Sequence, residues 1–210
     1  MRPKATRRKE QAQQTRAAIV EHAQRLFRER GFEAVTIEEI TDAAGVARGS
    51  FYTYFKNKSE IIIAEFRDID DYYRRYAANL KRYRTAQQKL LAFTRAQMRY
   101  VRDTVGNENL KVLYANQTIE PGSVKIINNR ERFWYHLIRD IIADGQAAGE
   151  FRSDRSAEQL ADWFNRTVRG LFLEWCISSG QEFDLVKEAE GYCRDWMIAA
   201  LARGKSVSGG

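Results

Sequence analysis

Apolar residues recur at helical spacing along most of this chain, and polar caps and glycines divide them into segments. Residues 15–30 illustrate the pattern, because Ile19, Leu26 and Phe27 fall on one face while charged residues occupy the others. Such a stripe predicts an amphipathic helix. Gly31 follows the stripe and predicts the end of that helix.

Two short helices are predicted next, on either side of a glycine. Thr36 and Glu39 have capping-box spacing, in which each side chain bonds the other residue's backbone N–H, so we expect a helix over about Ile37–Ala44. Gly45 supplies a backbone position that tolerates positive φ, and a further helix is expected over about Ala47–Tyr54. Two short helices about such a turn are typical of the helix-turn-helix motif.

Six more helices are predicted by caps and apolar stripes in the rest of the chain. The expected ranges are 57–82, 85–105, 108–118, 122–148, 156–175 and from 184 onward. No segment shows a convincing strand pattern. The sequence therefore predicts an all-α protein of about nine helices.

The outer face of the third predicted helix carries the residues best suited to reading DNA. Successive helical residues turn by about 100°, so if Phe51 points into the core, Gly49 and Thr53 lie opposite it, flanked by Ser50 and Tyr52. Small residues let a backbone approach a major groove closely, threonine can contact a thymine methyl group, and tyrosine can bind phosphate. The alternative is an exposed helix that binds nothing.

Residues 15–62 resemble the DNA-binding domain of TetR-family (TetR/AcrR-type) transcriptional regulators. The resemblance rests on Ile19, Ala23, Leu26-Phe27, Gly31-Phe32, Thr36-Ile37, Ile40, Ala44-Gly45-Val46, Gly49-Ser50-Phe51-Tyr52, Tyr54-Phe55, Lys58 and Glu60-Ile61. Looser similarity to the ligand-binding domain of that family lies in Asp144-Gly145, Gly149-Glu150-Phe151-Arg152, Gly170-Leu171 and Trp175. Thr41 departs from the family pattern, which usually has alanine there.

The resemblance implies a three-helix, helix-turn-helix DNA-binding domain followed by a larger helical effector-binding and dimerisation domain. We place a basic arm at 1–14, the DNA-binding domain at 15–60, the larger domain at 61–204 and a flexible tail at 205–210. The implied function is a homodimeric repressor that a small-molecule effector releases from a palindromic operator in double-stranded DNA. Activation in place of repression stays open.

The resemblance also assigns roles to residues of the first domain. Thr36, Tyr54 and Lys58 are expected to hold phosphates, and helix N-termini, where Thr36 and Lys58 lie, favour anions on physical grounds. The residues expected near base edges are Arg48, Ser50, Tyr52 and Thr53, although Tyr52 could instead touch the DNA backbone, and Gly49 is expected to belong to the same DNA-binding surface.

Charge supports a nucleic-acid partner, because the first sixteen residues hold six lysines or arginines and one glutamate. That segment therefore carries +5 of the net charge of +7 and leaves +2 for the remaining 194 residues. A basic arm suits contact with phosphates. The alternative is a solvated tail with no such contact.

Large aromatic residues in the last two predicted helices favour a dimer. Their apolar faces are too broad for one chain to cover, so packing against twofold mates would form a four-helix bundle. The alternative is burial within one chain. The residues expected at the interface are Phe172, Trp175, Tyr192 and Trp196.

Polar residues that interrupt apolar stripes in the middle helices suggest an effector pocket, as small-molecule sites are mostly apolar with a few polar groups. Arg130 is expected to pair with a polar or anionic group on a hydrophobic or aromatic effector. Each residue could instead be a satisfied core group or belong to the dimer interface. The candidates are Phe93, Gln97, Tyr100, Tyr114, Arg130 and Trp134.

Other function classes find little support. An all-helical enzyme, or a ligand-binding protein without a DNA role, would have to work with His22 and His136 and without a metal or cofactor motif. A membrane-surface protein would need bulky apolar residues in the basic arm. The longest apolar run, Trp196–Ala202, has seven residues, against about 18 to 20 for a membrane span. We therefore expect no catalytic residue, metal or cofactor, no membrane contact, a cytoplasmic location, and buried free thiols at Cys176 and Cys193.

Overall fold

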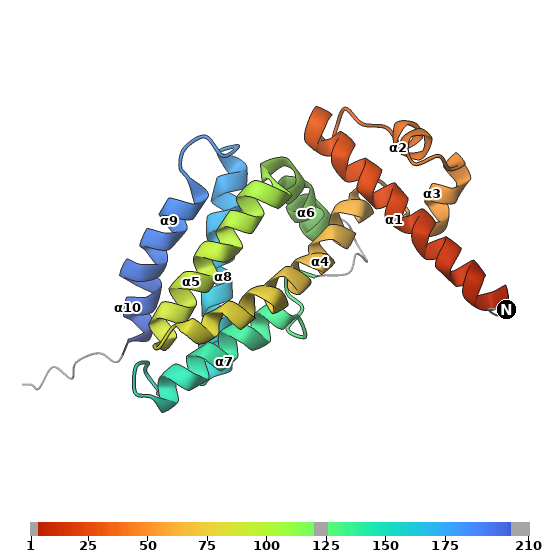
Figure 1. The fold of residues 1–210 in the computed structure, drawn as a ribbon. Helices are drawn as coiled ribbons and strands as arrows, with labels where there is room; N and C mark the ends of the chain where they lie inside the picture. Colours follow the sequence, from red (N-terminus) through yellow and green to blue (C-terminus); the bar gives the residue numbers. More distant parts are fainter. Residues whose placement is uncertain (1–3, 120–125, 203–210) are drawn as a thin grey trace, which may run out of the picture. The chain divides into compact units, whose positions relative to one another are not determined.

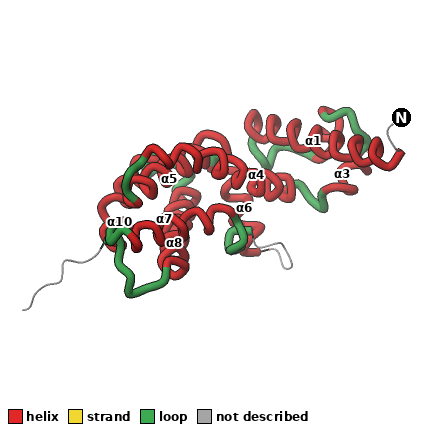
Figure 2. Tube along the Cα trace, turned by 60° about the horizontal axis from the view of Figure 1, so that its bottom comes forward, coloured by secondary structure: helices red, strands yellow, loops and turns green. Residues whose placement is uncertain are grey.

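The chain, seen in a computed structural model that describes residues 4–119 and 126–202, divides into two compact units. The first unit is Met1–Glu65 and the second is Phe66–Gly210. Helices and loops make up the described part (Figure 2), apart from a single isolated bridge between Phe151 and Ala202. The prediction of an all-α fold is confirmed.

From Lys4 onward, where the structure describes the chain, three helices and the start of a fourth form the first unit. These are α1 (Lys4–Arg30), α2 (Ile37–Ala43), α3 (Arg48–Tyr54) and the beginning of α4 (Ser59–Ala77) (Figure 1). The expected stripe on α1 is buried against α2 and α3, with Ile19 and Phe27 in the core. The predicted arm at 1–14 needs a correction. Helix α1 begins at Lys4, so the described residues of the arm are part of this helix.

Local chemistry sets the ends of α2. The Thr36 side chain accepts a hydrogen bond from the Glu39 backbone N–H, and the Glu39 carboxylate accepts one from the Thr36 N–H, so the predicted capping box is present. After α2, Gly45 has φ of 65°, a left-handed conformation that glycine adopts without steric cost. This turn directs the chain from α2 into α3.

In its described residues, the second unit contains the rest of α4 and six further α-helices. They are α5 (Ala86–Tyr100), α6 (Asn107–Ile119), α7 (Phe133–Ala147), α8 (Ala157–Ile177), α9 (Leu185–Tyr192) and α10 (Ile198–Leu201). A 3-10 helix, Ala78–Arg82, extends α4, and π-helical turns follow α5 at Val101–Val105 and α9 at Cys193–Met197. The last of these turns divides the ninth predicted helix into α9 and α10.

Helices α5, α7 and α8 supply much of the core of the second unit. Helix α5 packs against α7 and α9, and α8 packs against α6, α7 and α9. Leu90, Phe93, Ile138 and Val168 are fully buried between them. No described helix has both the length and the apolar character that crossing a membrane requires.

Gly145 marks the closest approach of α7 to its neighbours. A Cβ atom at this position would lie 2.3 Å from the Phe151 ring and 2.8 Å from the Ala86 Cβ. Distances this short lie far inside van der Waals contact, so only glycine allows α7, Phe151 and the start of α5 to pack as they do.

The seventh helix starts later than its predicted range of 122–148. Arg132 is in an extended conformation, with φ of −68° and ψ of 144°, and α7 begins only at Phe133. Arg130 therefore does not share a helical stripe with Trp134, and the two side chains have different surroundings.

Candidate nucleic-acid interface and effector cavity

Helix α3 presents an outer face of small and polar residues. Phe51 and Phe55 are buried, their ring centroids 5.6 Å apart, and they fix the inner face in the core of the first unit. Gly49, Tyr52 and Thr53 are exposed, Tyr52 by 51%. The predicted division of this helix into a core face and an outer face is therefore present.

Arg48, the first residue of α3, is tied to α2. Its guanidinium Nη1 lies 2.5 Å from the Glu38 carboxylate, and both side chains are more than half exposed. An exposed ion pair contributes little stability because water screens it. The pair orients the Arg48 side chain toward α2 in the free protein.

Lys58, the second expected phosphate ligand, is engaged within the free protein, and its contact with DNA stays a prediction. Its Nζ donates to the backbone oxygens of Phe32 at 2.6 Å and Val35 at 2.7 Å, and it lies 4.3 Å from the centroid of the Phe32 ring. Partial burial lowers the pKa of this amine from its ordinary value. The ammonium group thus fastens the loop between α1 and α2.

Thr36 is also engaged within the protein. Its hydroxyl donates to a Glu39 carboxylate oxygen at 2.9 Å, and its backbone N–H donates to the same oxygen at 2.8 Å. Arg30 donates to the other carboxylate oxygen at 2.7 Å. These hydrogen bonds, the Thr36 N–H first, lower the pKa of Glu39 to about 2. Thr36 is thus engaged in the free protein, and its expected phosphate contact stays a prediction. Tyr54, the third expected phosphate contact, is partly exposed.

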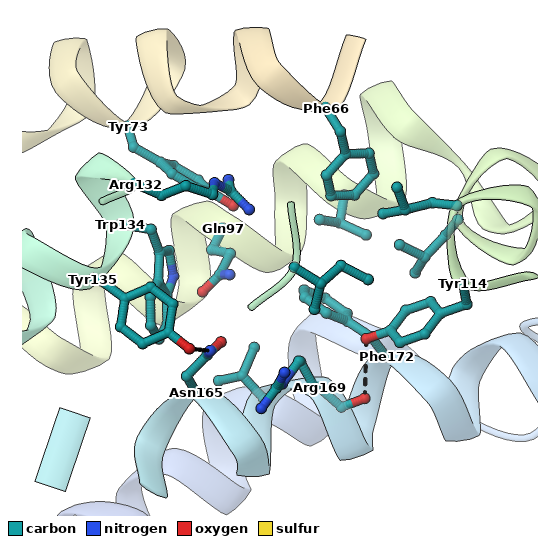
Figure 3. A pocket seen from close by; sticks show the side chains of 15 residues that line it. Phe66, Tyr73, Gln97, Tyr114, Arg132, Trp134, Tyr135, Asn165, Arg169 and Phe172 are labelled. Carbon is teal, nitrogen blue, oxygen red and sulfur yellow. Dashed lines mark hydrogen bonds between the residues drawn. The ribbon is translucent and has the colours of Figure 1, made fainter. Parts of the chain in front are cut away.

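The second unit contains a small, partly open cavity, which we call the effector cavity (Figure 3). Its volume is about 40 Å³, the space of roughly three water molecules. Apolar side chains and a smaller number of polar ones surround it, a composition typical of small-molecule sites. The lining residues are Phe66, Tyr73, Gln97, Val101, Leu110, Leu113, Tyr114, Ile127, Arg132, Trp134, Tyr135, Asn165, Val168, Arg169 and Phe172.

A buried ion pair joins the cavity wall to α4. Arg132 donates to Asp70 through Nε at 3.1 Å and Nη2 at 2.9 Å, and the two side chains are only 16% and 9% exposed. This two-pronged geometry suits a guanidinium and a carboxylate. Asp70 thereby neutralises the charge of Arg132 at the cavity.

Two polar side-chain atoms of the wall lack partners in the part of the chain that the structure describes. These are the Gln97 side-chain oxygen and the Trp134 indole N–H, and their side chains belong to residues that are 5% and 4% exposed. In Figure 3 both point toward the same end of the cavity. Buried polar groups are normally paired, so an acceptor and a donor that lack partners mark this end of the cavity.

The structure brings together only some of the predicted effector residues. Gln97, Tyr114 and Trp134 line the cavity, whereas Phe93 packs behind Tyr73 and Tyr100 stacks on Tyr72. The structure does not place Arg130 at the cavity, where the sequence analysis expected it. Its side chain is 68% exposed and forms an ion pair with Asp162 outside the cavity.

Arg132, two residues further on, is the arginine that reaches the cavity. Sequence reasoning missed it, although Arg132 directly precedes the aromatic cluster at the start of α7. Its partner lies 62 residues earlier in the chain, so no local spacing could reveal the pair.

The predicted dimer residues separate into buried and exposed sets. Phe172 and Trp175 are each only 6% exposed within one chain, so the expectation that they form an interface needs correction. Trp196 is 54% exposed and stacks on Tyr192, with ring centroids 5.1 Å apart. Trp163 of α8 is 42% exposed and contributes with Trp196 to a surface groove of about 340 Å³, which we call the tryptophan groove.

Neither the cysteines nor the acidic residues of the described part of the chain form a candidate redox or metal site. Cys176 and Cys193 are free and buried, as predicted, and burial raises the pKa of both thiols to about 11. Among the described residues, no group of three or more histidines, cysteines and carboxylates is placed to hold a metal ion.

Residues 19–64 match the sequence profile described as bacterial regulatory proteins of the tetR family. Over 58 residues the chain is 48% identical to the HTH-type transcriptional regulator TtgR of Pseudomonas putida, a match that spans 28% of each chain. It is 28% identical over 175 residues to the HTH-type transcriptional repressor KstR2 of Rhodococcus jostii (strain RHA1), spanning 79% of this chain and 81% of KstR2.

A solved structure shares the fold of both units. Thermus thermophilus FadR, a TetR-family transcriptional repressor crystallised with lauroyl-CoA, aligns over 93% of this chain and 100% of its own with a TM-score of 0.68 and 24% sequence identity. The all-α arrangement with an N-terminal helix-turn-helix is therefore shared with a known regulator.

Proposed function

Because the chain belongs to the TetR family of bacterial regulatory proteins, we propose that it is a DNA-binding transcriptional regulator that a small-molecule effector releases from its operator. The observation that carries this proposal is the outer face of α3, exposed at Gly49, Tyr52 and Thr53 within the segment that matches the family profile. A protein that binds chromosomal DNA would act in the cytoplasm.

Helix α3 would enter the major groove with this outer face toward the bases. Thr53 would contact a base edge, and Arg48 would leave Glu38 for a guanine or a phosphate. Lys58 would act indirectly, by holding the loop that precedes α2.

The regulator would act as a homodimer on a palindromic operator. A helix-turn-helix dimer places its two recognition helices in half-sites about one helical turn or a multiple of it apart. The tryptophan groove supports this proposal, because large exposed aromatic side chains are typical of the centres of protein interfaces. Trp163 and Trp196 would be covered by a second copy of the chain.

The effector would act through α4. This helix begins with Ser59 in the first unit, and in the second unit it carries Phe66, Asp70 and Tyr73 into the wall of the effector cavity or the ion pair beside it. A ligand larger than roughly three water molecules that fills this space would displace part of that wall. A displacement of α4 would change the position of the DNA-binding unit, and a differential of about 2.7 kcal/mol would lower operator affinity roughly a hundredfold.

The experiment that tests this function is selection of bound duplexes from random DNA, followed by a screen for compounds that release the selected site. We expect a palindromic consensus and at least one compound that reduces its occupancy. By linkage, the operator must weaken binding of that compound by the same factor. Failure to enrich any sequence over repeated rounds would contradict the proposal.

A further inference from the structure

The two polar atoms of the effector cavity that lack partners offer complementary hydrogen bonds to a ligand that displaces water from this space. The Gln97 side-chain oxygen can only accept a hydrogen bond, and the Trp134 indole N–H can only donate one. A hydroxyl group does both, because its oxygen accepts while its proton is donated. A carboxylate or an ether could satisfy Trp134 but would leave the Gln97 oxygen facing another acceptor.

The charges near the cavity favour an uncharged ligand. Arg132 and Asp70 neutralise each other through two hydrogen bonds. An anion would compete with Asp70 for Arg132, and a cation would compete with Arg132 for Asp70, and either would leave a buried charge uncompensated. Arg169, the other lining arginine, donates to the uncharged side chain of Asn128 at an exposed position, where water screens its positive charge.

The shape of the lining favours an aromatic ring. Trp134 and Tyr135 meet edge to face with centroids 5.2 Å apart at the end where the groups without partners lie, and Phe66 and Phe172 face the cavity from other elements (Figure 3). Aromatic rings pack well in offset-stacked or edge-to-face arrangements. A flat ring would therefore gain contact on several sides.

From these observations we propose that the effector cavity, widened by displacement of part of its wall, takes an uncharged phenol, whose hydroxyl accepts from the Trp134 indole N–H and donates to the Gln97 side-chain oxygen. This inference rests on the proposed function only in naming the ligand an effector. Binding to the cavity can be measured without DNA.

The test compares three probes of matched shape: p-cresol, toluene and 4-methylbenzoate. They differ in carrying a hydroxyl, no polar group and a carboxylate. Binding to the full-length protein is measured by calorimetry, and the indole N–H resonance of Trp134, assigned by its loss in Trp134→Phe, reports hydrogen bonding at that atom. We expect p-cresol to bind at least about tenfold more tightly than either other probe and to shift the Trp134 resonance.

Two variants locate the contact. Gln97→Met keeps the length of the side chain but removes the acceptor, and Trp134→Phe keeps an aromatic ring but removes the donor. Each should weaken p-cresol binding about tenfold and leave toluene binding nearly unchanged. Gln87→Met, an exposed position on the same helix α5, is the matched control and should bind all three probes as the parent does.

The probe comparison uses the unaltered protein, so it stands even where a variant is unstable. Equal binding of toluene, tighter binding of 4-methylbenzoate, a Trp134 resonance that p-cresol does not shift, or no binding of p-cresol would each overturn the assignment. Failure of operator selection would instead overturn the proposed function and leave the cavity assignment intact.

Discussion

The Lys58 Nζ atom lies 2.7 Å from the backbone oxygen of Val35, which precedes it by 23 residues. A cation at the edge of a DNA-binding motif suggests a phosphate ligand, yet this one stabilises the protein's own loop. Its effect on DNA binding would pass through the position of α2.

Lys58→Met would keep most of the side chain and remove the donor. We expect the free energy of unfolding of the protein to fall by about 1 to 3 kcal/mol, since the Phe32 and Val35 oxygens lose a charged partner. The slope of log affinity against log salt should stay unchanged, because no phosphate contact is lost. Urea unfolding and titrations of operator at several salt concentrations measure both. A slope reduced by about one, at unchanged stability, would restore the phosphate role.

Thr53 should influence sequence preference. Thr53→Ala removes a hydroxyl and a methyl group from the exposed outer face of α3, and a lost base contact is worth roughly 1 to 3 kcal/mol of discrimination. We expect the base preference to change at one position of each half-site, measured by repeating the selection from random DNA. Uniform weakening across all sequences would show that Thr53 contacts the backbone instead.

The capping box should make stability depend on acid. The pKa of Glu39 is lowered from 4.5 to about 2 by the Thr36 N–H and by Arg30, so the folded state favours the ionised carboxylate. Its contribution is therefore complete above pH 4.5 and is lost as the pH falls toward 2. Glu39→Gln should reduce the fall in melting temperature across this window. Glu21→Gln, at an exposed position of α1, is the control, and an equal change in both variants would contradict the assignment.

The pair of Asp70 and Arg132 should behave as one unit. Asp70→Leu leaves a guanidinium buried without its counter-charge, which costs about 3 to 5 kcal/mol of unfolding free energy. Adding Arg132→Met to that variant should recover most of the loss, since the double variant buries no uncompensated charge. Calorimetric melting of the parent, the two single variants and the double variant gives the four stabilities of a double-mutant cycle, which measures the coupling between the two residues. Additive losses would show that the two residues are not coupled.

Trp196 should contribute to a dimer interface. Trp196→Arg places a charge in the tryptophan groove, and we expect sedimentation at micromolar concentration to show monomers where the parent forms dimers. Ile119→Arg changes an apolar side chain that is 74% exposed on α6, outside this groove, and should leave the dimer intact. A folded dimer in the Trp196 variant would place the interface elsewhere.

Local sequence signals predicted the helix starts well wherever a side chain caps the helix. Thr36, Thr85 and Ser156 each accept a hydrogen bond from the backbone N–H three residues later, at the starts of α2, α5 and α8. The start of α7 was misplaced because Arg132, its N-cap, makes no side-chain capping bond and the apolar spacing continues upstream of it.

The spacing of residues along the sequence could not predict irregular helical turns or contacts between distant segments. The π-helical turn Cys193–Met197 breaks the regular helical period, so Met197 is buried while Trp196 is exposed. The ion pair of Asp70 with Arg132 joins distant segments, and only the fold brings them together. The sequence identified the tryptophans as candidate interface residues. Only the fold shows which of them are buried within one chain, and Trp175 is a core residue.

The tight packing around Gly145 also restricts how homologous sequences can diverge. In a library that varies every codon and is sequenced after selection for operator binding, position 145 should retain glycine almost alone, because even alanine collides with the Phe151 ring and with Ala86. Survivors with alanine should carry a smaller residue at 151. Paired changes at positions 145 and 151 would reveal, from the frequencies of the selected sequences, that α7 contacts the segment that follows it.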